Sequence, residues 1–273
     1  MMRFDRTLVI APHPDDDVIA AGGLIQRVLA SGGDIHVLFV TDGENNPWPQ
    51  RWMQKKWRLD ASDRAAWGAL RRDVACCSLD RLSVPAAATT FLGFPDQRIS
   101  ALIRAGNMEL LQSMRKVVTD FQPTAIVTPS SRDLHSDHRV IAWCAHVAAA
   151  GETAIATYVI HGQADERRLA ERIELTESEQ RRKRAAIECH HSQLLLSRER
   201  FLAHAGATES FYNAEYDLIG VPSAAREKLS VLRHALHVVI GNHTVLPPPQ
   251  QQPSGVQPAA DVQDRPGDVP GLL

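Results

Sequence analysis

The chain has 273 residues, of which 44% are hydrophobic and 23% charged, as is typical of a soluble globular protein with a sizeable core. The formal net charge of −2 argues against a strongly basic nucleic-acid-binding protein, so we expect no nucleic-acid partner. No apolar run reaches the roughly 18 residues that span a bilayer, and the first residues do not resemble a secretory signal, so we expect no transmembrane segment.

Predicted strands and helices alternate along the chain as far as residue 160. Residues 6–13 form a short apolar run that ends in proline and polar residues, which predicts a buried strand. Residues 17–33 have helical spacing, an acidic start and a glycine stop. The same criteria predict strands at 34–43, 89–94, 124–130 and 154–160, and helices at 60–79, 108–121 and 138–150. This alternation predicts an α/β fold, with a mostly parallel sheet and helices on both faces.

Two segments depart from this alternation, and a charged helix is predicted between them. Residues 45–59 hold tryptophans among prolines and basic residues, and they are too long for an ordinary loop between a strand and a helix. We expect this segment to be a lid on which Trp48 and Trp52 contact substrate; packing of its tryptophans into a small second core is the alternative. Residues 174–193 predict a capped helix that leads into a C-terminal helical region. The tail 247–273 is rich in proline, as linkers and disordered segments are, which leaves one domain before it, from residue 1 to 246.

The four cysteines show none of the paired CxxC spacing of zinc ribbons or thioredoxin-like sites. Cys76 and Cys77 are adjacent within the predicted helix 60–79, and we expect both to pack as small hydrophobic side chains. This use of cysteine fits a reducing compartment, so we expect a cytoplasmic protein.

Carboxylates follow four of the predicted strands. They lie in residues 13–17 after the first strand, 41–45 after the second, 95–96 after the third and 133–138 after the fourth. Two of these strand ends also carry histidines. Because ligands bind at the carboxyl ends of the strands in open parallel sheets, the sequence predicts a polar site at this edge.

Two histidines and one carboxylate are a common ligand set in catalytic zinc sites, which keep a further position open for water. His13 and Asp16 are three residues apart across a strand-to-helix turn, so both can face one ion. His135 and His138 have the same spacing, so one could bind a metal while the other points at substrate. A bound metal lowers the pKa of water toward about 7, and a nearby carboxylate that is not a ligand can take its proton.

Simpler interpretations exist for each motif alone. An aspartate-rich turn before a helix is often only an N-cap, and HSDH alone is more often a polar loop. Phosphoryl transfer through an aspartyl nucleophile would also use carboxylates after the first strand, but it does not need HSDH. A nucleotide site is disfavoured because no GxGxxG follows the first strand. The joint placement of the motifs at strand ends favours a metal site.

The four motifs, in this order, resemble those of the PIG-L/LmbE-like zinc deacetylases. AxHPDDD, TDGE, FLGFPD and HSDHR are similar to the family patterns (A/P)HPDDE, TxGE, LGxxD and HxDHR, and KRAAIECHHSQ resembles a later one. The resemblance covers residues 6–195. It implies a Rossmann-like fold, one Zn²⁺ per chain as cofactor, and removal of N-acetyl groups, commonly from N-acetylglucosamine.

The resemblance also assigns a role to each matching residue. The zinc ligands that it implies are His13, Asp16 and His138. It makes Asp15 the general base, and His135 the group that stabilises the oxyanion or protonates the leaving amine. Asp137 would orient His135. Asp17 stands where the family has a glutamate, and we expect it to support the site or to cap the helix.

Substrate contacts are implied less directly. Asp96 matches the family aspartate that hydrogen-bonds sugar hydroxyls. The family arginine that contacts substrate has no clean match; we select Arg64, with Arg71 and Arg72 as alternatives. Residues 45–59 favour a bulky, amphipathic small-molecule substrate, and transient contact with a membrane surface is a further expectation.

The chain as a whole is most similar to the glycopeptide-antibiotic (teicoplanin-type) pseudoaglycone deacetylases. The resemblance therefore implies release of acetate from an N-acetylglucosaminyl unit on such a pseudoaglycone, which leaves a free glucosaminyl amine. One alternative is the same chemistry on a thiol-precursor glycoside or a glycolipid. The other is a metal- or sugar-binding module without turnover.

Overall fold

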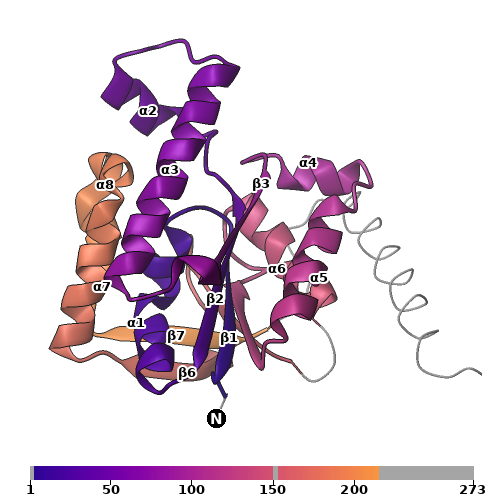
Figure 1. Ribbon diagram of the computed structural model, residues 1–273, viewed down its shortest axis with the longest axis vertical. Helices are drawn as coiled ribbons and strands as arrows, with labels where there is room; N and C mark the ends of the chain where they lie inside the picture. The colour runs from indigo at the N-terminus through magenta and orange to yellow at the C-terminus, as the bar shows by residue number, and fades with distance from the viewer. Residues whose placement is uncertain (1–2, 150–152, 215–273) are drawn as a thin grey trace, which may run out of the picture. The chain divides into compact units, whose positions relative to one another are not determined.

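The computed structural model describes residues 3–149 and 153–214. Within these ranges, a sheet of seven strands has the order β3-β2-β1-β4-β5-β7-β6 (Figure 1). The strands are β1 (Arg6–Ala11), β2 (Asp34–Thr41), β3 (Thr89–Phe94), β4 (Ala125–Pro129), β5 (Ala154–Tyr158), β6 (Leu169–Glu174) and β7 (Thr208–Asn213). Strands β1 to β5 pair in parallel, and β7 pairs antiparallel with both β5 and β6. The predicted α/β fold with a mostly parallel sheet is confirmed.

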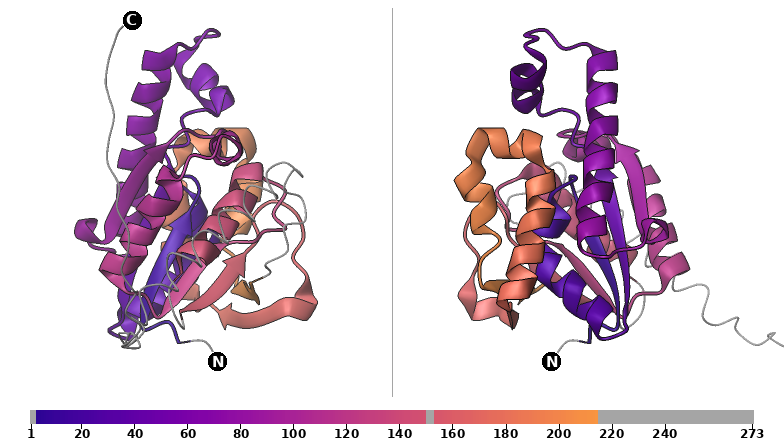
Figure 2. Two further views of the ribbon diagram at one scale, coloured as in Figure 1. Left: turned by 90° about the vertical axis from the view of Figure 1, so that its right-hand side faces the viewer. Right: turned by 60° about the vertical axis from the view of Figure 1, so that its left-hand side comes forward.

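Helices cover both faces of the sheet (Figure 2). The α-helices of the described residues are α1 (Asp16–Ala30), α2 (Pro47–Gln54), α3 (Ala61–Arg81), α4 (Ile99–Arg104), α5 (Glu109–Phe121), α6 (Ser136–Ala148), α7 (Glu177–Cys189) and α8 (His191–Ala203). Helices α1, α3, α7 and α8 share one core cluster, and α4, α5 and α6 share the other. Helix α2 lies off the sheet and contacts α8.

Strand β1 shows how the sequence produces these two layers. Leu8 and Ile10 pack with α4, α5 and α6, whereas Val9 and Ala11 pack on the opposite face with α1, α3 and α7. All four side chains are fully buried. A central strand of a parallel sheet is covered on both faces, which explains why its sequence is a continuous apolar run.

Each strand and helix predicted as far as residue 160 is present, with ends that differ by a few residues. The helix predicted at 174–193 is wrong in its extent, because the backbone of His190 leaves helical geometry and separates α7 from α8. The strands β6 and β7 were not predicted. Strand β6 is a charged edge strand with one buried residue, and β7 carries a buried glutamate, Glu209, so neither has the apolar run of a buried strand.

The segment expected to be a lid, residues 45–59, contains helix α2. Trp48, Trp52 and Trp57 are exposed over 52%, 73% and 77% of their surfaces. The alternative that they pack into a small second core is therefore wrong. Among the described residues, none of the helices has both the length and the apolar character to cross a bilayer. The domain end at residue 246 and the tail 247–273 lie outside the described residues.

Helix α3 corrects the expectation for Cys76 and Cys77. The buried residues of α3 recur at intervals of three or four, and they are Trp67, Gly68, Arg71, Ala75, Ser78 and Leu79. This spacing keeps one face of a helix toward the core. Cys76 and Cys77 lie off that face and are exposed, so the expectation that they pack as hydrophobic side chains is wrong.

Candidate active site

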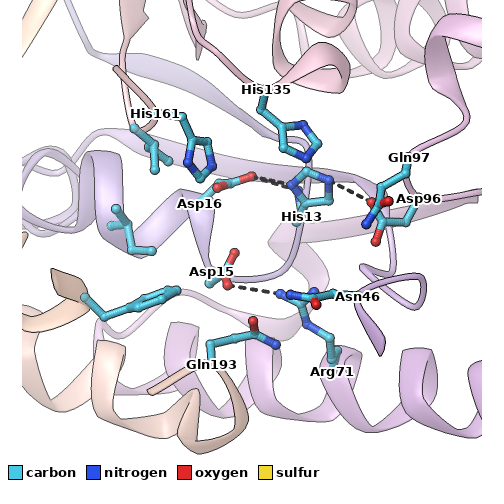
Figure 3. A pocket seen from close by; sticks show the side chains of 13 residues that line it. His13, Asp15, Asp16, Asn46, Arg71, Asp96, Gln97, His135, His161 and Gln193 are labelled. Carbon is cyan, nitrogen blue, oxygen red and sulfur yellow. Dashed lines mark hydrogen bonds and ion pairs between the residues drawn. The ribbon is translucent and has the colours of Figure 1, made fainter. Parts of the chain in front are cut away.

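The strand order reverses at β1, from which the chain runs outward to β2 and β3 on one side and to β4 and β5 on the other. Ligands of open α/β sheets bind outside the carboxyl ends of the strands at such a point. A cavity lies there, and Figure 3 shows the side chains that converge on it. The lining residues are His13, Asp15, Asp16, Ile19, Asn46, Arg71, Asp96, Gln97, His135, Ile160, His161, Gln193 and Phe201.

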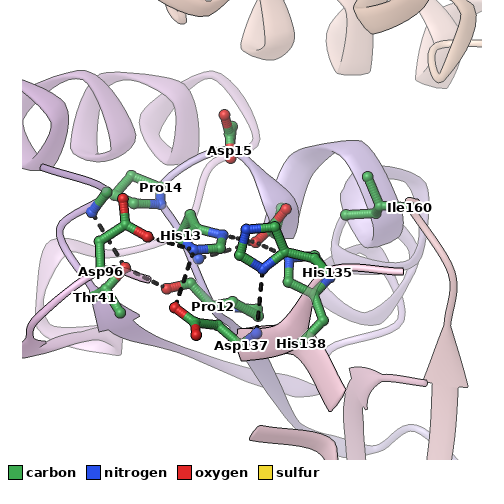
Figure 4. Close-up of polar contacts among 12 residues, drawn as sticks. Pro12, His13, Pro14, Asp15, Thr41, Asp96, His135, Asp137, His138 and Ile160 are labelled. Atoms are coloured by element: carbon green, nitrogen blue, oxygen red, sulfur yellow. Dashed lines mark hydrogen bonds and ion pairs between the residues drawn. The ribbon is translucent and has the colours of Figure 1, made fainter. Parts of the chain in front are cut away.

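The three predicted metal ligands lie together: Figure 3 labels His13 and Asp16, and Figure 4 labels His13 and His138. Oδ2 of Asp16 lies 3.1 Å from Nδ1 of His13 and 3.2 Å from Nε2 of His138. One ring nitrogen from each of His13, His135 and His138 also lies within 4.8 Å of the others. The residues around Asp16 therefore provide the donor set of two imidazoles and one carboxylate.

The surroundings of His138 fit a metal ligand. Its side chain is fully buried, and neither ring nitrogen makes a well-aligned hydrogen bond within the described residues. Burial lowers the pKa of His138, but the carboxylates of Asp16 and Asp133 outweigh burial and raise it to about 9. Surroundings that stabilise a proton on this ring also stabilise a bound cation.

The carboxylate of Asp133 lies next to the ring of His138. Oδ2 of Asp133 lies 3.3 Å from Nδ1 of His138. The same oxygen accepts the backbone N–H groups of Ile160 and His161 at 3.0 Å, and Oδ1 accepts that of His135 at 2.8 Å. This carboxylate joins the ends of β4 and β5 around the site. The sequence placed Asp133 after the fourth strand but gave it no role.

We expect Asp133→Asn to weaken the binding of Zn²⁺ by about 10- to 100-fold, the usual cost of losing a carboxylate that supports a metal-binding histidine. The measurement is a competition titration with a chromophoric chelator. Asp165→Asn is the matched control, because Asp165 caps a surface turn and pairs with Arg167. Equal affinity for Zn²⁺ in wild type and a folded Asp133→Asn would contradict the supporting role.

Asp15 lies beside this cluster in a strained backbone conformation. Its φ of +148° lies in a region that favours glycine, and non-glycine residues held there are concentrated at functional sites. Oδ2 of Asp15 accepts a hydrogen bond from Nη2 of Arg71 at 3.0 Å, and Arg71 also donates to the carbonyls of Pro14 and Gly43. Burial raises the pKa of Asp15 to about 6, against the opposing charge of Arg71. The carboxylate is thus fixed in the cavity wall.

Asp16 and Asp17, which follow Asp15 in the sequence, differ from it in the pKa of the carboxyl group. Burial raises the pKa of Asp16, but His138 and His13 outweigh burial and hold it well below its usual value. Asp17 is fully buried in the first turn of α1, and burial raises its pKa to about 8. The expectation that Asp17 caps the helix is wrong, because Asp15 occupies the N-cap position.

His135 is oriented by a backbone group. Its Nδ1 accepts the backbone N–H of Asp137 at 3.3 Å, which leaves Nε2 as the proton-bearing nitrogen of the neutral ring. Burial, with the charges of His13 and His138, lowers the pKa of His135 to about 4. The carboxylate of Asp137 lies elsewhere: it accepts the N–H of Gln97 at 2.7 Å and lies 4.0 Å from Nε2 of His13. The expected contact between that carboxylate and His135 is therefore corrected to a backbone contact.

Asp96 is buried against His13. One oxygen of Asp96 lies 3.0 Å from Nε2 of His13, and the other accepts the backbone N–H of Asn45 at 3.1 Å. The backbone N–H of Asp96 donates to Glu44 at 2.9 Å. Asp96 lines the cavity as expected of a substrate-binding residue, and it also contacts His13, which the sequence did not predict.

The structure does not bring every predicted residue to the cavity. Arg64 is exposed in the first turn of α3, whereas Arg71 lines the cavity, so the selection of Arg64 is corrected to Arg71. Arg72 pairs with Asp42 instead. Trp48 and Trp52 lie outside the lining, on the helix that follows Asn46.

His161 and Gln193 line the cavity without having been predicted there. His161 follows β5, and its Nδ1 lies 3.1 Å from Nη2 of Arg200. A histidine after the fifth strand is the same kind of signal that singled out the other strand ends. Gln193 belongs to the HHSQ segment that turns α7 into α8.

Solved structures share this fold. A pseudoaglycone deacetylase for the antimicrobial A40926, Dbv21, matches with a TM-score of 0.61 and 20% identity over 77% of this chain and 97% of that chain. The 4-carboxy-2-hydroxymuconate hydratase GalB of Pseudomonas putida KT2440 matches with a TM-score of 0.58 and 21% identity over 73% and 82% of the two chains. These likenesses show the fold alone. Because the two proteins have different activities on the same fold, the chemistry has to be argued from the site residues.

Relatives in sequence match about half of the chain. The 1D-myo-inositol 2-acetamido-2-deoxy-alpha-D-glucopyranoside deacetylase of Rhodococcus jostii (strain RHA1) is 30% identical over 147 residues, 49% of this chain and 49% of that protein. The chain thus spans about half the length of the curated relatives it matches. The model of the PIG-L family, described as GlcNAc-PI de-N-acetylase, matches residues 8–146, which include both histidine-bearing strand ends. The chain therefore belongs to the PIG-L family.

Proposed function

We propose that this protein is a metal-dependent N-deacetylase that hydrolyses the N-acetyl group of an N-acetylglucosaminyl unit and releases acetate and a free amine. The observation that supports the proposal is that two neighbouring carboxylates have different partners. Asp16 lies against His13 and His138, while Asp15 is held apart from them by Arg71. A ligand set with a separate base beside it is what metal-assisted hydrolysis requires.

His13, Asp16 and His138 would hold the cation. We propose zinc, since two imidazoles and one carboxylate are a common catalytic zinc set, although iron or cobalt suits similar donors. When bound, such a cation polarises an amide carbonyl and lowers the pKa of water.

The remaining groups act on protons and orientation. Asp15 accepts a proton from the attacking water, with its carboxylate held by Arg71. His135 turns the N–H of Nε2 toward the acetamide, where it stabilises the developing oxyanion or assists the leaving nitrogen. Asp96 and Gln97 line the same cavity and can contact sugar hydroxyls.

We propose a bulky, amphipathic conjugate as the substrate, with a glycopeptide-antibiotic pseudoaglycone as the leading candidate. Asn46 lines the cavity, and α2 begins at the next residue, with Trp48 and Trp52 exposed on it. Helix α2 contacts α8, where Leu195 and Leu196 are also exposed. Exposed aromatic and aliphatic groups beside a polar cavity suit a ligand with a sugar at one end and an apolar aglycone at the other.

The test is acetate release by the zinc-loaded protein from four substrates. These are an N-acetylglucosaminyl pseudoaglycone, an N-acetylglucosaminyl inositol, an N-acetylglucosaminyl lipid and free N-acetylglucosamine. We expect the highest kcat/KM for the pseudoaglycone, and loss of activity with a chelator. If the inositol glycoside is the best substrate, the deacetylase proposal holds and its substrate changes; if none releases acetate, the function itself is refuted.

Trp52→Ala tests the role of α2. We expect it to raise KM for the pseudoaglycone by about 10-fold, roughly the contribution of one aromatic contact, and to leave kcat unchanged. Hydrolysis of free N-acetylglucosamine should not change, because Trp52 does not line the cavity. Trp57→Ala, which removes an equally exposed indole beyond the end of α2, is the control. Unchanged KM for the pseudoaglycone in Trp52→Ala would remove α2 from substrate binding.

A further inference from the structure

A pair of thiols lies outside the active site. Cys77 belongs to α3 and Cys189 ends α7, and their Sγ atoms are 3.6 Å apart although the residues are 112 positions apart in the sequence. Both are free thiols. Of the other two cysteines, Cys76 is exposed and Cys144 is buried.

Buried contacts between α3 and α7 set this distance. Beside Cys77, the hydroxyl of Ser78 donates to the carbonyl of Ala186 at 2.9 Å. Leu79 and Ile187 belong to the same core cluster, one turn or less from the two cysteines. The thiols are therefore carried by two packed helices. Closing the gap to the roughly 2.05 Å of a disulfide needs a movement of about 1.5 Å, which side-chain rotation can supply.

The two thiols differ in accessibility. Cys77 is exposed and Cys189 is partly buried, and burial raises the pKa of the Cys189 thiol. An oxidant from solution therefore reaches Cys77 first. Cys189 then lies in position as the second thiol, at the 3.6 Å separation already present.

We propose that Cys77 and Cys189 form a reversible disulfide with a small-molecule disulfide, such as oxidised glutathione, as the oxidant. The Cys77 thiolate attacks one sulfur of the oxidant, its S–S bond breaks, and one reduced glutathione leaves. The Cys189 thiolate then attacks Cys77 in the mixed disulfide and releases the second glutathione. Two electrons pass from the cysteines to the oxidant, and the two protons end on the two glutathione thiols.

The cross-link would fasten two helices that reach the cavity wall. Arg71 lies on the buried face of α3, before Cys77 in the sequence, and donates to Asp15. His190 follows Cys189, is buried, and is the N-cap residue of α8, on which Gln193 lines the cavity. The disulfide would thus lie behind the cavity and would restrain α3 against the start of α8. This inference does not depend on the proposed function.

The test uses the full chain, reduced and then incubated with oxidised glutathione in the folded state. We expect non-reducing peptide mapping to show one cross-link between Cys77 and Cys189. We also expect the melting temperature to rise by about 5 °C or more and to return when dithiothreitol is added. Cys76→Ser should behave as the wild type. Cys77→Ser and Cys189→Ser should keep the melting temperature of the reduced protein and show no rise with the oxidant.

Two results would overturn the proposal. One is a lasting glutathione adduct on Cys77 with Cys189 still free, which would mean that the helices do not let the sulfurs meet. The other is a covalent dimer as the main oxidation product. If one of the two single serine variants folds poorly, the other still decides the test.

Discussion

Asp15→Asn is expected to lower kcat for acetate release by about 10²- to 10⁴-fold and to leave bound metal unchanged. Asparagine keeps the size and shape of the side chain but cannot accept a proton at neutral pH. The proposed ligand set does not include Asp15, whose carboxylate pairs with Arg71 at 3.0 Å. The substitution therefore removes the proposed base and keeps the proposed metal ligands.

The choice of asparagine follows from the backbone. At the φ of +148° of Asp15 most side chains are strained, and asparagine, which has the size and branching of aspartate, adds no strain to that already present. Its amide oxygen can still accept the hydrogen bond from Arg71. Local structure should thus be retained, and the loss of turnover can be assigned to proton transfer.

Asp16→Asn supplies the contrast. Metal analysis of the purified variants should show loss of the cation in Asp16→Asn, because Oδ2 of Asp16 lies against both His13 and His138. Activity and metal should disappear together in that variant, whereas Asp15→Asn loses activity alone. Normal turnover in Asp15→Asn would refute its role as base, and loss of metal in that variant would make Asp15 a ligand.

The position of the site could be predicted because it depends on topology. Parallel strands bring their carboxyl ends to one edge, so the sequence could place His13 and His138 at the same edge of the sheet. They lie near each other because β1 and β4 are neighbours in the sheet. The buried strands themselves were visible as apolar runs such as Leu8 to Ala11. Neither inference needed a side-chain orientation.

Side-chain partners depend on packing between distant segments, so they cannot be predicted from the spacing of residues in the sequence. The carboxylate of Asp137 turns away from His135 because the backbone N–H of Gln97, from the loop after β3, holds it. Arg71 reaches the cavity rather than Arg64 because the buried face of α3 begins at Trp67. The pair of Cys77 and Cys189 likewise exists only because α3 packs on α7.

Lys183→Met is expected to destabilise the fold by about 3–5 kcal/mol, the usual cost of leaving one charge of a buried ion pair alone. Nζ of Lys183 lies 2.6 Å from Oε1 of Glu209, and these side chains are 1% and 2% exposed. Glu209 also accepts the backbone N–H groups of Gly23 and Leu24 at 2.6 and 2.8 Å. Removing the lysine leaves a buried carboxylate whose remaining hydrogen-bond donors, among the described residues, are these two backbone N–H groups.

The two glycines of α1 explain why the pair fits. A Cβ on Gly22 would lie 3.0 Å from Cγ of Lys183, and one on Gly23 would lie 2.3 Å from Cδ2 of Leu175. Glycine weakens a helix interior by about 1 kcal/mol relative to alanine. At these two positions of α1, glycine lets α7 and β7 pack close enough for the ion pair to form.

The double variant Lys183→Met/Glu209→Gln separates charge from packing. It removes both charges, keeps an acceptor for the N–H groups of Gly23 and Leu24, and should be more stable than Lys183→Met alone in urea unfolding. Lys116→Met in the exposed pair with Asp120 is the control and should change the free energy of unfolding by at most about 0.5 kcal/mol. A double variant as unstable as the sum of the two single variants would show that lost packing, rather than an unpaired charge, causes the destabilisation.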